Sequence, residues 1–270
     1  LYFAMTDYSL EELTLLSHIS SLYGKLATAH FSALDLQQAL KNKLGRLITS
    51  LDVLAKKDVN EVCTPCFTVR CSVLEDKLPE AFDLIIEVLK ETDLRQKEKI
   101  REIIVQSNEQ LKQLGVMSGH SLGVFSTLSR YAASAAVSSA VSGLPLIQKT
   151  AALVRDFDAR FDAFADLMQK FQNDTICRSR LIFASVSAAK DHDISGLLRR
   201  LPEGTPVAEN AAYQSDLPDH MGYQIPAQIG FAVQGYYLPK EQFGSASTQR
   251  MYARPFAPMP LTISVSLSIP

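Results

Sequence analysis

The sequence predicts an α+β fold in which an antiparallel sheet is layered with helices. Three observations lead to this prediction: segments of helical periodicity come first, two strand-like segments follow around a charged turn, and a long helical stretch then leads to one further strand. Strands and helices do not alternate along the chain, as they would around a parallel sheet. The chain has 270 residues, 47% of them hydrophobic and 21% charged, which is enough to bury one large core or two smaller ones.

The first part of the chain predicts two helices and a hairpin. Residues 9–23 and 32–44 each begin with a serine and carry apolar residues at helical spacing. Residues 45–55 and 61–74 read as strands because they are rich in β-branched residues, and the charged turn KKDVN separates them. We expect these two strands to pair as an antiparallel hairpin.

A long helical stretch follows the hairpin. Residues 78–92 carry Pro79 near the expected helix start, and residues 93–115 end on Gly115 at the position of a C-cap glycine. Residues 118–144 are rich in alanine and serine and predict close-packed helix that breaks near Gly143.

Two more helices are expected over residues 144–171, where four apolar side chains form one stripe that we interpret as core. The stripe consists of Phe157, Phe161, Phe164 and Met168. Residues 177–189 predict a strand.

The domain organisation is predicted from shifts in composition. The opening letters LYF resemble the remains of a cleavable tag. Residues 1–5 are therefore interpreted as the tag remnant and the start of the chain, and they are left out of the predicted fold. An α+β domain is expected over residues 6–203, with a boundary near the Pro/Gly-containing stretch LPEGTPV. Residues 204–237 then predict a linker and the first strand or strands of a further domain, and residues 238–270 form a proline-punctuated tail.

Composition argues against several classes of partner. The net charge is −2, so no broad basic face for nucleic acid is expected. No apolar run approaches the ~20 residues that span a bilayer, and no secretory signal opens the chain. The compartment stays open: cytoplasmic if the protein is bacterial, organellar if it is eukaryotic.

The pentapeptide GHSLG matches G-x-S-x-G, the nucleophile elbow that would make Ser121 a catalytic serine. An elbow needs a strand before the serine and a helix after it, whereas the residues before Gly119 belong to an amphipathic helix. We therefore interpret the surrounding SGHS as a helix N-terminus. The acids and histidines that could complete a triad are Asp191, His192, Asp193 and His220.

The cysteines allow a second kind of site. Cys63 and Cys66 have the C-x-x-C spacing of a redox pair or half a zinc site, but the residues after them read as strand, not as the helix of a thioredoxin-type pair. A four-cysteine zinc site would also need Cys71 and Cys177 to converge on the pair. The alternative that we favour is small buried or strand-end cysteines.

The remaining polar residues do not complete a site. His18 and His30 have no acid or thiol at ligand spacing, and no H-E-x-x-H or H-x-x-E-H motif occurs. The acid pairs are interpreted as solvated faces or caps; they are Glu11 with Glu12 and Glu75 with Asp76. We therefore assign no catalytic, cofactor-binding or metal-binding residue.

Three segments, in order, resemble the presequence-protease branch of the insulinase and pitrilysin type metallopeptidases. They are LTLLSHISSLYGKLATAHFSALDLQQALKNKLGRLITSLDV, MSGHSLGVFSTLSRYAASAAVSSAVSGLPLIQ and ENAAYQSDLPDHMGYQIPAQIGFAVQGYYL. The resemblance extends over roughly residues 6–236. It implies the fold of an insulinase or mitochondrial processing peptidase-like domain, with residues 6–203 similar to the family's third domain and residues 204–237 to the start of its fourth.

The resemblance also implies a function. Members of the family enclose unstructured peptides in a chamber of four α+β domains, and zinc is held by an inverted H-x-x-E-H motif in the first. This chain is then expected to be a non-catalytic chamber wall that binds no metal itself, with Zn in the full-length enzyme. Its expected partners are the zinc-bearing N-terminal half and an unstructured peptide lying along the strand PAQIGFAV.

One element of the family pattern is missing. The family's fourth domain donates an arginine and a tyrosine from a stretch like R-x-x-G-G-A-Y, whereas Arg250 and Tyr252 here lack the glycines. Two alternatives therefore remain: a non-enzymatic homologue like the core subunits of respiratory complexes, and a serine hydrolase acting through Ser121.

Overall fold

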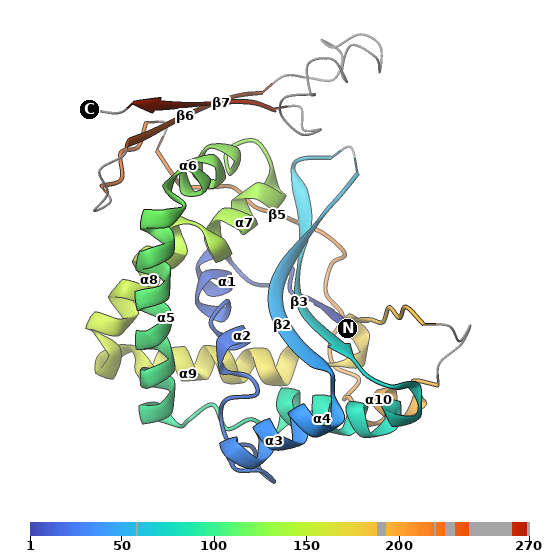
Figure 1. Ribbon diagram of the computed structural model, residues 1–270. Coiled ribbons are helices and arrows are strands. Elements are labelled where there is room, and N and C mark those ends of the chain that lie inside the picture. Colours follow the sequence, from blue (N-terminus) through green and yellow to red (C-terminus); the bar gives the residue numbers. More distant parts are fainter. Residues whose placement is uncertain (58, 188–192, 219, 225–229, 238–260, 269–270) are drawn as a thin grey trace.

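The computed structural model describes residues 1–270 except residues 58, 188–192, 219, 225–229, 238–260 and 269–270. Figure 1 shows the predicted α+β architecture: helices pack beside a curved antiparallel sheet, and a second, two-stranded sheet lies against α6. No helix among the described residues is both long and apolar enough to cross a bilayer.

The main sheet has the strand order β2-β3-β1-β4, and β5 also pairs with β3. The predicted hairpin is confirmed: β2 and β3 pair antiparallel over ten residues, with Leu51 opposite Phe67. The strands are β1 (Tyr2–Ala4), β2 (Arg46–Ala55), β3 (Val62–Ser72), β4 (Leu181–Ile182) and β5 (Ala211–Ala212).

The exclusion of the first residues from the fold is wrong. Residues 2–4 form β1, which lies between β3 and β4 in the middle of the sheet. Phe3 and Met5 are fully buried and belong to the hydrophobic core. Since a segment that supplies core side chains is part of the fold, residues 1–5 cannot be treated as an appendage.

The helices largely follow the predicted periodicity, but the first one is interrupted. Where one helix was predicted over residues 9–23, Ser17 and His18 separate α1 from α2, because a tight turn from the His18 N–H to the Leu15 carbonyl oxygen ends the first helix. The first helices are α1 (Leu10–Leu16), α2 (Ile19–Leu22), α3 (Ala33–Lys43), α4 (Leu78–Lys90) and α5 (Lys97–Met117).

The sequence had suggested that Gly115 is the C-cap of a helix, but the structure shows that it is not. Helix α5 continues through it to Met117, and Gly115 is buried inside the helix. A Cβ at this position would lie 3.6 Å from Ile147 Cδ1, an ordinary van der Waals distance, so the contact between α5 and α8 does not by itself require a glycine.

The predicted alanine-rich helix is two helices, α6 and α7, and Gly143 ends the second of them as expected. A Cβ on Gly143 would lie 2.5 Å from the Ser139 carbonyl oxygen, so the chain can turn directly into α8 only with glycine there. The remaining helices are α6 (Gly119–Leu128), α7 (Ala133–Ser142), α8 (Leu144–Arg155), α9 (Phe157–Asp174) and α10 (Ser195–Arg200).

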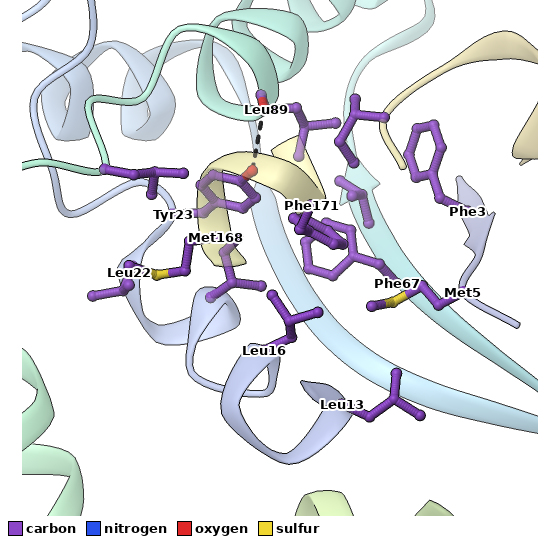
Figure 2. Close-up of a cluster of buried hydrophobic side chains, with 14 of the residues drawn as sticks. Phe3, Met5, Leu13, Leu16, Leu22, Tyr23, Phe67, Leu89, Met168 and Phe171 are labelled. Atoms are coloured by element: carbon purple, nitrogen blue, oxygen red, sulfur yellow. Dashed lines mark hydrogen bonds between the residues drawn. The ribbon is translucent and has the colours of Figure 1, made fainter. Parts of the chain in front are cut away.

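The core lies between the sheet and helices α1, α2, α4 and α9. Figure 2 shows Phe67 of β3 beside Phe171 and Tyr23. The ring of Phe67 meets Phe171 edge-on at 5.0 Å and Tyr23 edge-on at 5.8 Å between centroids. The Tyr23 hydroxyl donates to the Leu89 carbonyl oxygen at 3.2 Å. The predicted stripe on α9 is confirmed, since all four of its side chains are buried.

Within residues 177–187, the described part of the strand predicted over residues 177–189, the strand is much shorter than expected. Only Leu181–Ile182 are extended in β4, and residues Arg178–Arg180 form a turn of 3₁₀-helix before them. The Arg180 side chain of this turn is directed inward and is 5% exposed. Its guanidinium donates to both carboxylate oxygens of Asp7, at 2.8 and 3.0 Å.

Residues 202–213, which we call the strap, are bonded to the main body along their length. The Arg180 Nε–H donates to the Thr205 carbonyl oxygen at 3.1 Å, and the Thr6 and Thr64 hydroxyls donate to the carbonyl oxygens of Ala208 and Glu209, both at 2.6 Å. At its end β5 pairs with β3, and the Tyr213 hydroxyl donates to the Tyr8 carbonyl oxygen at 3.1 Å. The stretch predicted as a linker is therefore anchored to the body, while the division at residues 203 and 204 stays a prediction.

The second sheet consists of β6 (Gly230–Tyr237) and β7 (Leu261–Ser268), paired antiparallel with Val233 opposite Val265. Strand β6 confirms part of the strand-like pattern predicted there, and β7 lies within the proline-punctuated tail, for which no particular element was predicted. Both strands contact α6, at the opposite end of the molecule in Figure 1 from α3 and α4.

Candidate functional site

The GHSLG segment forms the start of α6, as expected for a helix N-terminus. Ser121 is the third residue of α6, and the residues before it belong to α5 rather than to a strand. The strand–turn–helix geometry that exposes a nucleophilic serine is therefore not built around Ser121.

The second glycine of the pentapeptide has a packing role instead, together with a glycine of β6. A Cβ on Gly123 would lie 2.7 Å from Val233 Cγ2, and a Cβ on Gly235 would lie 2.5 Å from Thr127 Cγ2. Each glycine thus faces a β-branched residue of the other element, which lets α6 and β6 approach closely. The Tyr131 hydroxyl, just after α6, donates to the Gly235 carbonyl oxygen at 2.9 Å and fixes the contact.

A groove of 640 Å³ lies along this contact between α6, the segment 217–223 and β6. His220 and Tyr223 line it beside Gln234, and apolar side chains such as Leu122 and Phe231 complete its wall. The ring of Phe231 lies 5.6 Å from that of His120 at the start of α6. Both polar and apolar side chains line the groove.

The groove does not bring together the residues named as triad candidates. His220 lines it, but Ser121 is not among its lining residues. Asp193 accepts a hydrogen bond at 2.8 Å from the N–H of Ser195, the first residue of α10. Asp191 and His192 lie outside the described residues, as do Arg250 and Tyr252 and the start of the PAQIGFAV segment.

Three of the four cysteines are buried, in line with the small buried or strand-end cysteines that we favoured. Cys63 and Cys66 are both fully buried, and because they are three residues apart on one strand their side chains point to opposite faces of the sheet. Burial raises the pKa of Cys63 to about 12 and that of Cys66 to about 11, so both are neutral thiols near pH 7. All four cysteines are free, and Cys71 is the exposed one.

These thiols do not fit a metal or redox site. The thiolate is the form that binds metals and attacks disulfides, and burial disfavours it here. Among the described ranges, no three His, Cys, Asp or Glu side chains are grouped so that they could hold a metal ion. The expectation that this chain binds no zinc stays a prediction.

His18 is a buried core residue. It is 3% exposed, its ring packs edge-on against Phe164, and its Nε2 lies 2.9 Å from Thr150 Oγ1. The Thr150 hydroxyl donates its one proton to the Leu146 carbonyl oxygen, so it accepts from His18 and Nε2 carries the ring proton. Burial lowers the pKa of His18 to about 4, which keeps the ring neutral.

His30 has an acidic partner that sequence spacing did not reveal. Its Nδ1 lies 3.0 Å from Glu87 Oε2 on α4, and Glu87 also accepts from the Thr28 hydroxyl. The two residues are far apart in the sequence, so no local spacing could predict the pair. Among the predicted acid pairs, Glu12 forms a capping box with Ser9 at the start of α1, as a cap interpretation requires.

Sequence reasoning missed the groove and the anchored strap. Both depend on contacts between residues roughly a hundred or more positions apart, such as Tyr131 with Gly235 and Tyr8 with Tyr213. The glycines of GHSLG were a local signal, but the pentapeptide had been interpreted through the serine between them.

Comparison with known protein families gives a match. A family model for a peptidase-associated domain, described as "Peptidase M-16C associated", matches residues 1–153, which is more than half of the chain. The matched segment extends from β1 into α8 and includes α6, whereas the strap, β6 and β7 lie beyond it. No curated protein matches the chain.

Proposed function

Because the chain belongs to the peptidase M-16C associated family, we propose that it is a non-catalytic segment of a zinc-dependent endopeptidase of the presequence-protease type. In this proposal it forms chamber wall for the zinc-bearing half of the same protein, which degrades unstructured peptides. The match over residues 1–153 to a domain described as associated with a peptidase is the observation that carries the proposal.

Two features of the described residues support a wall rather than a catalytic centre. Ser121 lies on a helix that follows another helix, and the cysteines Cys63 and Cys66 are buried neutral thiols. The groove between α6 and β6, with a volume of 640 Å³, offers a concave surface on which an extended peptide could lie. It is bordered by β6, whose first residues belong to the PAQIGFAV segment that is expected to contact substrate. No step of peptide hydrolysis is assigned to a residue of this chain.

The proposal is tested by cleavage of a short, unstructured, fluorescence-quenched peptide. The chain is assayed alone and mixed with the separately expressed zinc-bearing half, each with and without a chelator, and complex formation is followed in parallel by size-exclusion chromatography. Chelator-sensitive cleavage that needs both halves is the expected result.

Two other outcomes contradict the proposal. Chelator-resistant cleavage by the chain alone that is lost in Ser121→Ala supports the serine hydrolase instead. A stable complex of the two halves without cleavage supports the non-enzymatic homologue.

A further inference from the structure

Strand β2 is a long unpaired edge of the main sheet. It pairs with β3 on one side over ten residues, and on its other side no backbone hydrogen bond to any described residue is formed. All ten of its residues are half-buried or exposed. The strand carries neither proline nor lysine, the residues with which proteins usually block a free edge.

The residues of β2 divide between two faces. Leu47, Leu51 and Val53 pack against the core, and the Thr49 hydroxyl donates to the Ser20 carbonyl oxygen on the same face. On the other face Arg46 and Asp52 are charged, and they lie at the two ends of a seven-residue stretch.

The two charged side chains of this stretch differ in whether they have partners within the chain. Asp52 is half-exposed and accepts from Arg70 of β3 at 2.7 Å and from Ser50 at 3.1 Å. The Arg46 guanidinium is exposed and has no hydrogen-bond or ion-pair partner in the part of the chain that the structure describes. A carboxylate can accept from more than one cation, so Asp52 keeps capacity for a second partner.

We propose that two copies of this chain associate through their β2 edges into one continuous antiparallel sheet centred on Thr49. A two-fold axis perpendicular to the sheet keeps each face continuous, because residues that share a face then stand opposite each other. In this register Arg46 of each copy lies opposite Asp52 of the other, and Leu47 lies opposite Leu51. The dimer thus gives the unpaired guanidinium a carboxylate at both of its symmetric ends.

Neighbouring registers lack this complementarity. A dimer centred one residue later sets Asp52 opposite the apolar Ile48, and one centred on Leu51 sets Arg46 opposite Lys56. A dimer centred on Asp52 itself sets two carboxylates against each other. Like charges directly opposite destabilise strand pairing, so the charge pattern selects the Thr49-centred register.

The test uses charge reversal on the full 270-residue chain, with the molar mass measured by sedimentation at increasing protein concentration. The unchanged chain is expected to form a dimer. Arg46→Asp and Asp52→Arg each place like charges at both symmetric contacts, so each is expected to raise the dissociation constant at least about tenfold. Arg199→Asp, the same change in charge on α10, serves as the control and is expected to leave association unchanged.

Mixing Arg46→Asp with Asp52→Arg tests the register more directly than either variant alone. In a heterodimer, the aspartate introduced at position 46 of one variant chain faces the arginine introduced at position 52 of the other, and the native Asp52 faces the native Arg46. An equal mixture is therefore expected to dimerise with nearly the affinity of the unchanged chain, although each variant alone does not. A chain that stays monomeric at all concentrations overturns the proposal, as do a dimer insensitive to both reversals, a mixture without recovery, or a β2 edge that binds only unrelated extended peptides.

Discussion

The main sheet and the β6–β7 sheet are both antiparallel, but different interactions hold each in place. Strand β3 of the main sheet packs into the hydrophobic core. Its Phe67 side chain is fully buried between the aromatic rings of Tyr23 and Phe171. The β6–β7 sheet contacts α6 through close backbone approach, where Gly123 and Gly235 face Val233 and Thr127. The first arrangement depends on how much apolar surface is removed from water, and the second on the absence of single Cβ atoms.

Because of this difference, the core is expected to determine the stability of the whole fold, and the glycine contact only the stability of the β6–β7 sheet. A two-stranded sheet is marginally stable by itself, so β6 and β7 depend on α6, whereas the main sheet has a contiguous core. Disturbing the core should lower the stability of the whole fold, and disturbing the glycine contact should release β6 while the main sheet stays folded.

The largest effect is expected from Phe67→Ala. Removing a fully buried ring from β3 leaves a cavity beside Phe171 and Tyr23, and we expect the free energy of unfolding to fall by about 4 kcal/mol. Urea denaturation followed by circular dichroism measures this. Phe231→Ala on the half-buried β6 is the matched control, and an equal loss in both variants would show that the two sheets do not differ as described.

Arg180→Met is expected to be the next most severe change. It removes the bidentate bonds to Asp7 and the bond to the Thr205 carbonyl oxygen, at a cost of about 2–3 kcal/mol. Limited proteolysis should then cut the strap faster, and urea denaturation gives the overall loss. Arg178→Met removes only the exposed ion pair with Glu203, which should cost less than about 1 kcal/mol, so comparable losses would argue against a specific role for Arg180.

Protonation of His18 should make the main body sensitive to acid. Burial lowers its pKa to about 4, whereas an unfolded histidine titrates at about 6.5. The stabilisation is complete above pH ~6.5 and is lost as the pH falls towards 4, since only the unfolded chain binds the proton in this range. Between pH 6.5 and 5 the free energy of unfolding should fall by about 2 kcal/mol.

His18→Gln should flatten this dependence, and His120→Gln, at an exposed position, should leave it unchanged. Urea denaturation at a series of pH values measures both. A slope that survives His18→Gln would assign the sensitivity to other groups.

The smallest and most local effect is expected from Gly123→Ala. The added methyl group meets Val233 Cγ2 at 2.7 Å, so the free energy that holds β6 to α6 should fall by about 1 kcal/mol or more. Because alanine favours the helix by about 1 kcal/mol over glycine, the melting temperature of the main body should not fall. Hydrogen exchange of the β6 amides should accelerate.

Two further variants sharpen this prediction. Gly196→Ala on α10, where nothing lies within 4 Å, should change no amide exchange in β6. The double variant Gly123→Ala, Val233→Ala should restore slow exchange by removing the clashing methyl group. Slow exchange in Gly123→Ala alone would mean that the contact does not depend on the missing Cβ.

The sequence predicted the helices and strands that depend on patterns among neighbouring residues. The α9 stripe, the β2–β3 hairpin and the α3 helix entered through Ser32 follow from periodicity and capping, and the structure confirms them. Predictions based on single residues were less reliable, because Gly115 lies within α5 and is not its cap, and Gly123 serves packing against β6 and not an elbow.

Contacts between distant residues could not be predicted in this way. The burial of Phe3 and the inward turn of Arg180 depend on segments more than a hundred positions away. For the same reason the groove beside α6 was not foreseen, since its two walls come from α6 and from residues after 216.

The central place of β1 has a consequence for synthesis. Residues 2–4 leave the ribosome before the rest of the sheet, but β4 follows near residue 181, and the strap that bonds to Thr6 and Tyr8 lies 202 to 205 positions further along the chain. At roughly 5–20 residues per second, the nascent chain waits about 10 to 40 s before these partners exist. During that time β1 can pair only with β3, so Phe3 and Met5 are incompletely covered, and a chaperone that holds the emerging segment should raise the yield of folded protein.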